Sequence, residues 1–219
     1  KLTNDIIDPK NTGLENEIKK NKQLINKINS INKTNLSHIQ KIFYLIYDCK
    51  RLGTLPFAGI ARCAFISKTI LDSLKKEGFL TTEELNNFNR SIKTVSTEIN
   101  EEYVKSLKKN NFKNFIVKYG HLRPSMYSII NKNYKENFNN YFSKSKRNYI
   151  KKIIKFNISK NKKEKINKLF TQSGMFFNFD EFIDFAKKSI ENREKSKLIF
   201  SKSIDEIFIN LKMLATEID

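Results

Sequence analysis

Residues 36–53 read LSHIQKIFYLIYDCKRLG, and this stretch indicates the secondary structure of the whole chain. Its apolar side chains recur at intervals of three and four residues, at Leu36, Ile39, Ile42, Phe43, Ile46 and Tyr47. That interval places them on one face of a helix, which has about 3.6 residues per turn. We expect this helix to end near Leu52-Gly53, with Gly53 in the left-handed conformation of a helix C-terminal cap.

The same periodicity continues on both sides of this stretch. It predicts helices over about 15–30, 55–77, 81–109, 112–119, within 150–156, from about 180, and from a cap at Ser203 to Leu214. Thr81 with Glu84 has the spacing of a capping box. Strand-like alternation is absent apart from residues 176–179. We therefore predict an all-α fold, an irregular multi-helix bundle, with a helical lead-in over 1–35 and one helical domain over 36–219.

Composition limits the class of protein. With 39% hydrophobic and 12% aromatic residues, the chain can form a sizeable core. It has no run of about 18 apolar residues, so we expect no membrane-spanning segment. The start at Lys1 lacks an initiator Met and a signal peptide, which indicates a part of a longer chain. Cys49 and Cys63 are expected to be buried thiols in a reducing compartment, the cytoplasm.

A net charge of +19 raises the possibility of a nucleic-acid partner. Residues 131–168 carry 13 Lys or Arg against two Glu. However, only six of the 42 basic residues are Arg, the residue that phosphate and base-edge contacts favour. A Lys-dominated excess is more typical of a solvated surface, so we do not favour nucleic acid as the partner.

Several kinds of active site are missing from the sequence. Six scattered glycines form no phosphate-binding loop, and there is no serine-nucleophile motif. His38 and His121 are the only histidines, and no cysteine pair has the spacing of zinc ligands. We therefore expect the chain to bind no metal and no nucleotide by itself.

The most concentrated polar segment is residues 118–124, KYGHLRP, followed by Tyr127. Gly120 would permit a backbone angle closed to other residues, and Pro124 would stiffen the exit from the segment. His121 and Arg123 could then face one side of a rigid loop, as a hydrogen-bonding or proton-exchanging imidazole and an anion-binding guanidinium. In the alternative interpretation, both side chains cap neighbouring helices and Arg123 pairs with a carboxylate.

Three other charged side chains lie on or beside apolar helix faces. Lys68 falls on the stripe of Phe57, Ala61 and Ala64, so we expect at least its stem to be buried. Arg62 flanks that stripe, and Glu98 flanks the next predicted helix. They could form a buried ion pair between core helices, and Arg193 with Glu194 and Lys197 could form ordinary pairs on a helix surface.

The order of these elements resembles a known family. The matching segments are LPFA at 55–58 with Ala61-Arg62, TVSTE at 94–98, YGHLRP at 119–124 with Tyr127, and Arg193-Glu194. Over about 52–201 they are similar to the central region of phosphoenolpyruvate synthase/pyruvate phosphate dikinase-like phosphotransferases. Within that family, they are most similar to the L-glutamine kinases of capsular phosphoramidate biosynthesis. Residues 125–128 read SMYS where the family more commonly has Gly-Thr-Tyr-Asp.

The resemblance implies an enzyme that converts ATP, L-glutamine and water to glutamine amide phosphate, AMP and phosphate. ATP and Mg²⁺ would be used by an ATP-grasp-like domain, and a phosphohistidine domain would carry the phosphate. This chain would bind L-glutamine or a similar acceptor, contact both domains and be inactive alone. The implied catalytic residues are His121 and Arg123, and the implied substrate-binding residues are Arg62, Lys68, Glu98, Tyr119, Tyr127 and Arg193.

Three functions remain open at this point. The first is an acceptor-binding domain in which the charged residues converge on one pocket that holds an amino-acid zwitterion. The second is a basic helical module that binds nucleic acid through residues 131–168. The third is a scaffold without a small-molecule site, whose helices hold neighbouring domains.

Overall fold

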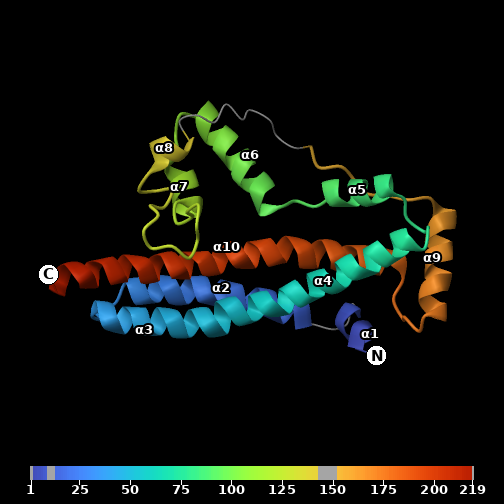
Figure 1. Cartoon of the computed structure of the whole chain (residues 1–219), viewed down its shortest axis with the longest axis horizontal. Coiled ribbons are helices and arrows are strands. Elements are labelled where there is room, and N and C mark those ends of the chain that lie inside the picture. The colour runs from blue at the N-terminus through green and yellow to red at the C-terminus, as the bar shows by residue number, and fades with distance from the viewer. Residues whose placement is uncertain (1, 9–12, 143–151, 219) are drawn as a thin grey trace. The chain divides into compact units, whose positions relative to one another are not determined.

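The computed structural model describes residues 2–8, 13–142 and 152–218, and these are helical with no strand among them (Figure 1). This confirms the predicted all-α, multi-helix fold. In chain order the elements are α1 (Leu2–Ile7), α2 (Gly13–Asn32), α3 (His38–Asp48), the π-helix η1 (Cys49–Thr54), α4 (Leu55–Lys76), α5 (Thr82–Arg90), α6 (Val95–Lys108), α7 (Lys113–Tyr119), α8 (Phe138–Phe142), α9 (Lys160–Gln172) and α10 (Phe179–Ile218).

The chain divides into two compact units, each made of three separate stretches of sequence. Unit 1 comprises residues 1–18, 57–94 and 152–194, and unit 2 comprises residues 19–56, 95–151 and 195–219. Both α2 and α10 therefore contribute to each unit. The predicted boundary after residue 35 falls inside the first stretch of unit 2, and it stays a prediction.

Unit 1 is organised around an apolar core formed by α4, α5, α9 and the first part of α10. Phe88 and Ile166 are fully buried there, and Phe170 and Phe182 are 2% and 0% exposed. The rings of Phe170 and Phe182 meet edge to face with their centroids 5.8 Å apart, an arrangement that adds to the burial of their apolar area.

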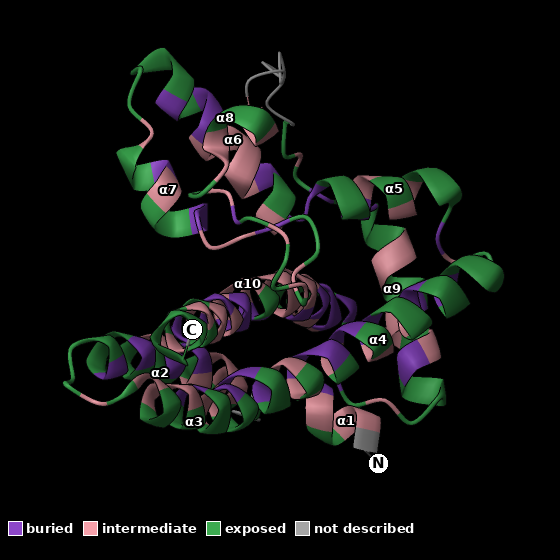
Figure 2. Ribbon diagram, turned by 60° about the vertical axis from the view of Figure 1, so that its left-hand side comes forward, coloured by how far each residue is buried: buried purple, intermediate pink, exposed green. Residues whose placement is uncertain are grey.

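In unit 2, the later part of α2, α3 and the C-terminal part of α10 lie side by side (Figures 1 and 2). Leu24, Ile28, Leu45 and Phe200 are all buried in this group of helices. Hydrogen bonds cross it as well, because the Ser203 hydroxyl donates to the Leu45 carbonyl over 3.3 Å. Apolar burial and a satisfied buried hydroxyl therefore fix α10 against α3.

The capping box at Thr81 and Glu84 is present, which confirms that prediction. The prediction of one helix over 81–109 is wrong, because α5 ends at Arg90 and α6 begins at Val95. The N–H of Ser91 bonds to the carbonyls of the last turn of α5, and its hydroxyl donates to Phe88. Each of the two helices buries its apolar side chains in the core of a different unit.

Gly53 does not end a helix, so that prediction is also wrong. It lies in η1, through which α3 continues into α4, and only Gly78 and Gly174 have positive φ among the glycines described. A Cβ at Gly53 would lie 2.8 Å from the Cβ of Phe200 and 3.0 Å from Cδ2 of Leu24. Glycine is required there by close packing rather than by backbone conformation.

Two predictions in the last third of the chain are wrong. Residues 152–159 are not helical, so the described part of the predicted helix, which includes Ile153, Ile154 and Phe156, is not a helix; Ile150 lies outside the described residues. The helix predicted from about 180 and the one capped at Ser203 are a single helix, α10, of 40 residues. Ser203 lies inside it because its hydroxyl bonds to α3 instead of capping a new helix.

The helical stretch His38–Lys76 contains a window with a mean hydropathy of 1.2, of which 33% is buried. By length and composition this stretch could cross a bilayer, although core helices of water-soluble proteins pass the same test. The expectation that no segment spans a membrane stays a prediction. Cys49 is a buried free thiol, as expected, whereas Cys63 is only partly buried.

Candidate functional site

The polar segment predicted as a site begins where α7 ends. α7 is held by an aromatic cluster of unit 2 in which Tyr103, Phe115 and Tyr119 are buried. The centroids of the Phe115 and Tyr119 rings are 5.2 Å apart. Tyr119, proposed from the sequence as a substrate-binding residue, is fully buried in this cluster. Its position in the core fixes the start of the segment that follows.

Gly120 has an ordinary helical conformation, with φ of −59°, so the expected unusual backbone angle is wrong. The position nevertheless requires glycine because of space. A Cβ here would meet the carbonyl oxygen of Ile116 and would lie 3.1 Å from the Cβ of Lys135. The close approach allows the chain to fold back on itself directly after α7.

Residues 120–137, called the 120–137 loop below, are closed by hydrogen bonds between the two ends of the loop. The N–H of Tyr134 donates to the Leu122 carbonyl over 2.7 Å, and the N–H of Lys135 donates to the Gly120 carbonyl over 2.9 Å. Near its end, the N–H of Asn133 donates to the Glu136 carboxylate over 2.8 Å. The loop is therefore a self-bonded structure and not an open connection.

Arg123 occupies the interior of this loop, with a side chain that is only 3% exposed. Its guanidinium forms an ion pair with Asp205 on α10, which is 6% exposed, and its Nη1 donates to the carbonyls of Ser128 and Asn131 over 3.3 and 3.2 Å. The guanidinium carbon also lies 5.0 Å from the ring centroid of Phe208. Arg123 thus uses its fork of donors to bind the loop to α10.

Asp205 is held by a second donor besides Arg123. The side-chain amide of Asn133 donates to its two carboxylate oxygens over 3.1 and 3.3 Å. Burial raises the pKa of the Asp205 carboxyl above its ordinary value, and the hydrogen bond from Asn133 and the charge of Arg123 oppose that rise. The ion pair is stable as long as both of its members are present, because either charge alone would be buried without a partner.

His121 lies one turn of α10 away from this pair. Its Nε2 is 3.1 Å from the Leu198 carbonyl and 3.2 Å from the Ser201 hydroxyl, so Nε2 carries the proton and donates to Leu198. Burial lowers the pKa of His121 to about 4, which makes the ring neutral at pH 7. Its Nδ1 is buried and has no hydrogen-bond partner among the described residues. Proton exchange near neutral pH, expected from the sequence, does not fit this pKa.

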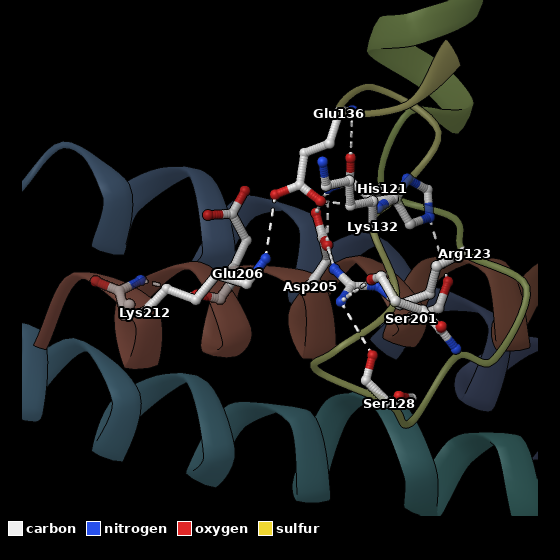
Figure 3. A network of polar contacts seen from close by, with 12 residues as sticks. His121, Arg123, Ser128, Lys132, Glu136, Ser201, Asp205, Glu206 and Lys212 are labelled. Atoms are coloured by element: carbon white, nitrogen blue, oxygen red, sulfur yellow. Dashed lines mark hydrogen bonds and ion pairs between the residues drawn. The ribbon is translucent and has the colours of Figure 1, made fainter. Parts of the chain in front are cut away.

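Three of the residues predicted from the sequence contact one face of α10, and Figure 3 shows two of them, His121 and Arg123. Glu98 of α6 pairs with Lys195 over 3.6 Å, His121 contacts Leu198 and Ser201, and Arg123 pairs with Asp205. The α10 residues in these contacts, at positions 195, 198, 201 and 205, are three or four residues apart and therefore lie on one face of the helix. Glu98 and Arg123 each have a partner within the protein, so a zwitterion held between them would have to displace Lys195 and Asp205.

The remaining predicted residues do not belong to this alignment. Tyr127 is in the 120–137 loop but points into solvent, with 69% exposed. Arg62, Lys68 and Arg193 belong to unit 1. The side chain of Lys68 is 73% exposed and lies 4.0 Å from Asp72, so the prediction that its stem is buried is wrong. Arg62 is exposed as well, and the guanidinium of Arg193 lies over the ring of Phe65 at 5.7 Å.

Sequence reasoning missed the acceptors and donors that complete the network. They are Asp205, Asn133, Glu136 and Lys212, of which the last two pair over 3.2 Å. Asp205 alone left a signal, because it lies four residues after Ser201 and three before Phe208 on the face that α10 buries. An acidic residue on an apolar helix face needs a buried partner. Asn133 and Glu136 lie in a loop without periodicity, and nothing in the sequence pairs them with α10.

In chemical terms, two buried polar atoms of the segment have no hydrogen-bond partner among the described residues, the Tyr119 hydroxyl and Nδ1 of His121. The guanidinium and the carboxylates of the network are occupied by each other, whereas Nδ1 of His121 has a lone pair without a donor. A neutral imidazole nitrogen of this kind accepts a hydrogen bond from an N–H or O–H group. Comparison with known proteins found no matching family model, no matching curated protein and no matching solved structure.

Proposed function

We propose that the chain is the acceptor-side helical part of an ATP-dependent phosphotransferase of the phosphoenolpyruvate synthase/pyruvate phosphate dikinase-like class. The proposed reaction is that of the L-glutamine kinases, in which ATP, L-glutamine and water give glutamine amide phosphate, AMP and phosphate. ATP and Mg²⁺ belong to other domains in this proposal, as the resemblance implies. This chain contributes the acceptor site and the docking of the phosphohistidine domain in the cytoplasm.

One observation carries the proposal. The motif YGHLRP, on which the family resemblance depends most, folds as one rigid loop on α10, and the loop leaves Nδ1 of His121 without a partner. The primary amide of glutamine has N–H groups that such a nitrogen accepts once the 120–137 loop shifts to expose it, since Nδ1 is buried in the closed loop. In this role His121 orients the acceptor amide, while Arg123 positions the loop through Asp205. The exposed phenol of Tyr127 offers a further contact for the acceptor or the incoming domain.

The substitution that tests this role is His121→Gln. The side-chain amide of Gln reaches the place of Nε2 and keeps a donor for the Leu198 carbonyl, but it has no acceptor at the place of Nδ1. We expect the variant to fold normally and to lose glutamine-dependent AMP formation in the full-length enzyme. His121→Asn, whose oxygen lies near the place of Nδ1, should retain more activity than His121→Gln. Equal and near-normal turnover in both variants would refute the role of His121.

Direct binding is measured by isothermal titration of L-glutamine into this chain and into the full-length enzyme. We expect heat of binding that disappears in His121→Gln and is unchanged in Val117→Ala, a substitution of an exposed side chain on α7. Arg123→Ala is unsuitable as the first test, because it leaves Asp205 buried without its partner.

The scaffold function is the second candidate, and the buried ion pair of Arg123 with Asp205 favours it. The guanidinium of Arg123, which the sequence predicted as a catalytic group, is used for contacts within the protein. If L-glutamine binds neither form and His121→Gln leaves AMP formation intact, the chain acts as a scaffold. Nothing specific favours nucleic acid, since Lys162 and Lys163 of the basic stretch pair with Glu84 and Asp180.

A further inference from the structure

The largest unexplained feature of unit 2 is an exposed apolar surface on α3. Five large side chains form it and are called the α3 face below: Ile39 (62% exposed), Phe43 (64%), Tyr44 (46%), Ile46 (44%) and Tyr47 (49%). On the opposite side of α3, Leu45 is completely buried, and Cys49, the first residue of η1, is only 6% exposed. Single exposed apolar residues are ordinary, whereas a continuous group of this kind marks a surface that binds something.

The α3 face is held rigidly from both ends. At its start, the Ser37 hydroxyl and the Gln40 side chain form a capping box, which fixes where α3 begins. At its end, α3 runs into the π-helix η1, where Gly53 packs against α2 and α10. π-helical turns are uncommon and occur frequently at functional sites. A preformed helix face binds a partner without the entropic cost of ordering a flexible segment.

The charges beside the α3 face are positive. Lys50 and Arg51 follow it directly and are both exposed, and Asp48, the only acidic residue between 33 and 56, is partly buried. The Nη1 of Arg51 donates to the Tyr47 hydroxyl over 2.9 Å, and its guanidinium carbon lies 5.0 Å from the Tyr47 ring centroid. The cationic end of the face is thus in contact with its aromatic part. A complementary partner carries acidic groups at this end.

Composition separates a protein partner from a lipid surface. Phe, Tyr and Arg are enriched where proteins bind proteins, and Lys is depleted there. In a chain whose basic residues are mostly Lys, the α3 face has Arg51 stacked on Tyr47, with Lys41 and Lys50 at its edges. A helix that lies on a membrane typically has many Lys or Arg along its flanks. A second copy of this chain fits poorly, because a net charge of +19 on each copy opposes self-association.

We infer that the α3 face is a docking site for an amphipathic helix of another protein or domain, one with an apolar stripe and with Asp or Glu at the end that meets Lys50 and Arg51. The inference does not depend on the proposed phosphotransferase function. The apolar stripe packs on Ile39, Phe43 and Tyr47, and the acidic groups pair with the two cations. Helix-on-helix recognition of this kind uses anchors spaced three and four residues apart.

The test uses three synthetic helical peptides with the same leucine stripe and with Glu, Gln or Lys at the positions beside one end of it. Binding to the whole chain is followed by fluorescence anisotropy of a labelled peptide. We expect the Glu peptide to bind most tightly, the Lys peptide most weakly, and the preference to shrink at high salt. Phe43→Asp should weaken the binding of the Glu peptide about 30-fold, because it removes an aromatic anchor of the interface. Val117→Asp, also at an exposed apolar residue, should have no effect.

A charge exchange decides whether the contact is specific. The variant with Lys50→Glu and Arg51→Glu should reverse the order of the peptides and prefer the Lys peptide. Equal binding of the three peptides, no binding of any of them, or no response to Phe43→Asp overturns the inference. Two other results would also overturn the inference. If the chain dimerises in sedimentation velocity and Phe43→Asp abolishes the dimer, the face binds a second copy. If the chain binds phosphatidylglycerol vesicles but no peptide, and Phe43→Asp abolishes the vesicle binding, the face binds lipid.

Discussion

Removal of the Arg123 guanidinium is the perturbation for which the structure gives the clearest magnitude. In Arg123→Ala the Asp205 carboxylate, 6% exposed, keeps only the amide of Asn133 as a donor. The carbonyls of Ser128 and Asn131 lose their donor at the same time. Breaking one side of a buried ion pair costs about 3–5 kcal/mol, and we expect a loss of free energy of unfolding in this range. Arg62→Ala, at an exposed arginine, should cost less than about 0.5 kcal/mol.

The assay is urea unfolding followed by circular dichroism at 222 nm, and a double-mutant cycle isolates the pair. Arg123→Met and Asp205→Leu should each destabilise strongly, because each leaves one charge buried alone. The double variant has neither charge, so its loss should be smaller than the sum of the two single losses by about 2 kcal/mol or more. Additive effects, or single losses below about 1 kcal/mol, would refute the view that this pair holds the 120–137 loop on α10.

The pH dependence of the Arg123→Ala defect supplies a second check. Burial raises the pKa of Asp205, and without Arg123 the pKa of this carboxyl rises further. The folded variant then binds a proton that the unfolded chain has already lost, so its stability falls as pH rises through this range. We expect the difference from wild type to be smallest near pH 4 and largest at neutral pH. A defect that is the same at both pH values would contradict a buried carboxylate as its cause.

Three further outcomes follow from other contacts. The pKa of His121 is lowered from 6.5 to about 4, so between these pH values the unfolded chain binds a proton that the folded chain does not. The free energy of unfolding of the wild type should therefore fall by up to about 3 kcal/mol as the pH is lowered from 6.5 to 4. His121→Gln should remove this fall when stability is measured against pH. Gly53→Ala places a Cβ 2.8 Å from that of Phe200 and should cost about 1–3 kcal/mol in urea unfolding, against about 1 kcal/mol for Gly78→Ala, which has positive φ but open space. Thr81→Ala removes a helix cap and should cost about 1 kcal/mol, whereas Glu84→Gln keeps the capping geometry and loses only the ion pair with Lys162, so its smaller cost should vanish in high salt.

The two units explain why some helix predictions succeeded and others did not. The capping box at Thr81 and Glu84 is local chemistry, and the sequence alone located the start of α5. The end of α5 depends on where its apolar side chains are buried. Ile92 belongs to the core of unit 1 and Tyr103 to the aromatic cluster of unit 2, so a periodic pattern that reads as one helix is divided between two cores. Periodicity contains no information about which core a residue joins.

The candidate site was only partly accessible to the same reasoning. The segment from Tyr119 to Arg123 was correctly expected to be ordered, and the alternative in which Arg123 pairs with a carboxylate matches its contact with Asp205. That partner is 82 residues away, and Asn133 joins it from a loop without periodicity. Whether the Arg123 guanidinium is free to bind a ligand or is paired within the protein depends on contacts between distant parts of the chain.

By itself, the sequence determined that the chain is helical and that a capping box at Thr81 starts α5, and it identified residues 118–124 as the most concentrated polar segment. These properties depend on spacing and on contacts within a few residues. The tertiary structure alone decided that Gly53 lies inside a π-helix, that Ser203 bonds to α3 within a continuous α10, and that Arg123 and Glu98 have partners on α10. Each of these outcomes depends on burial, since a polar group removed from water takes whichever partner the packed helices bring to it, however far away in the sequence.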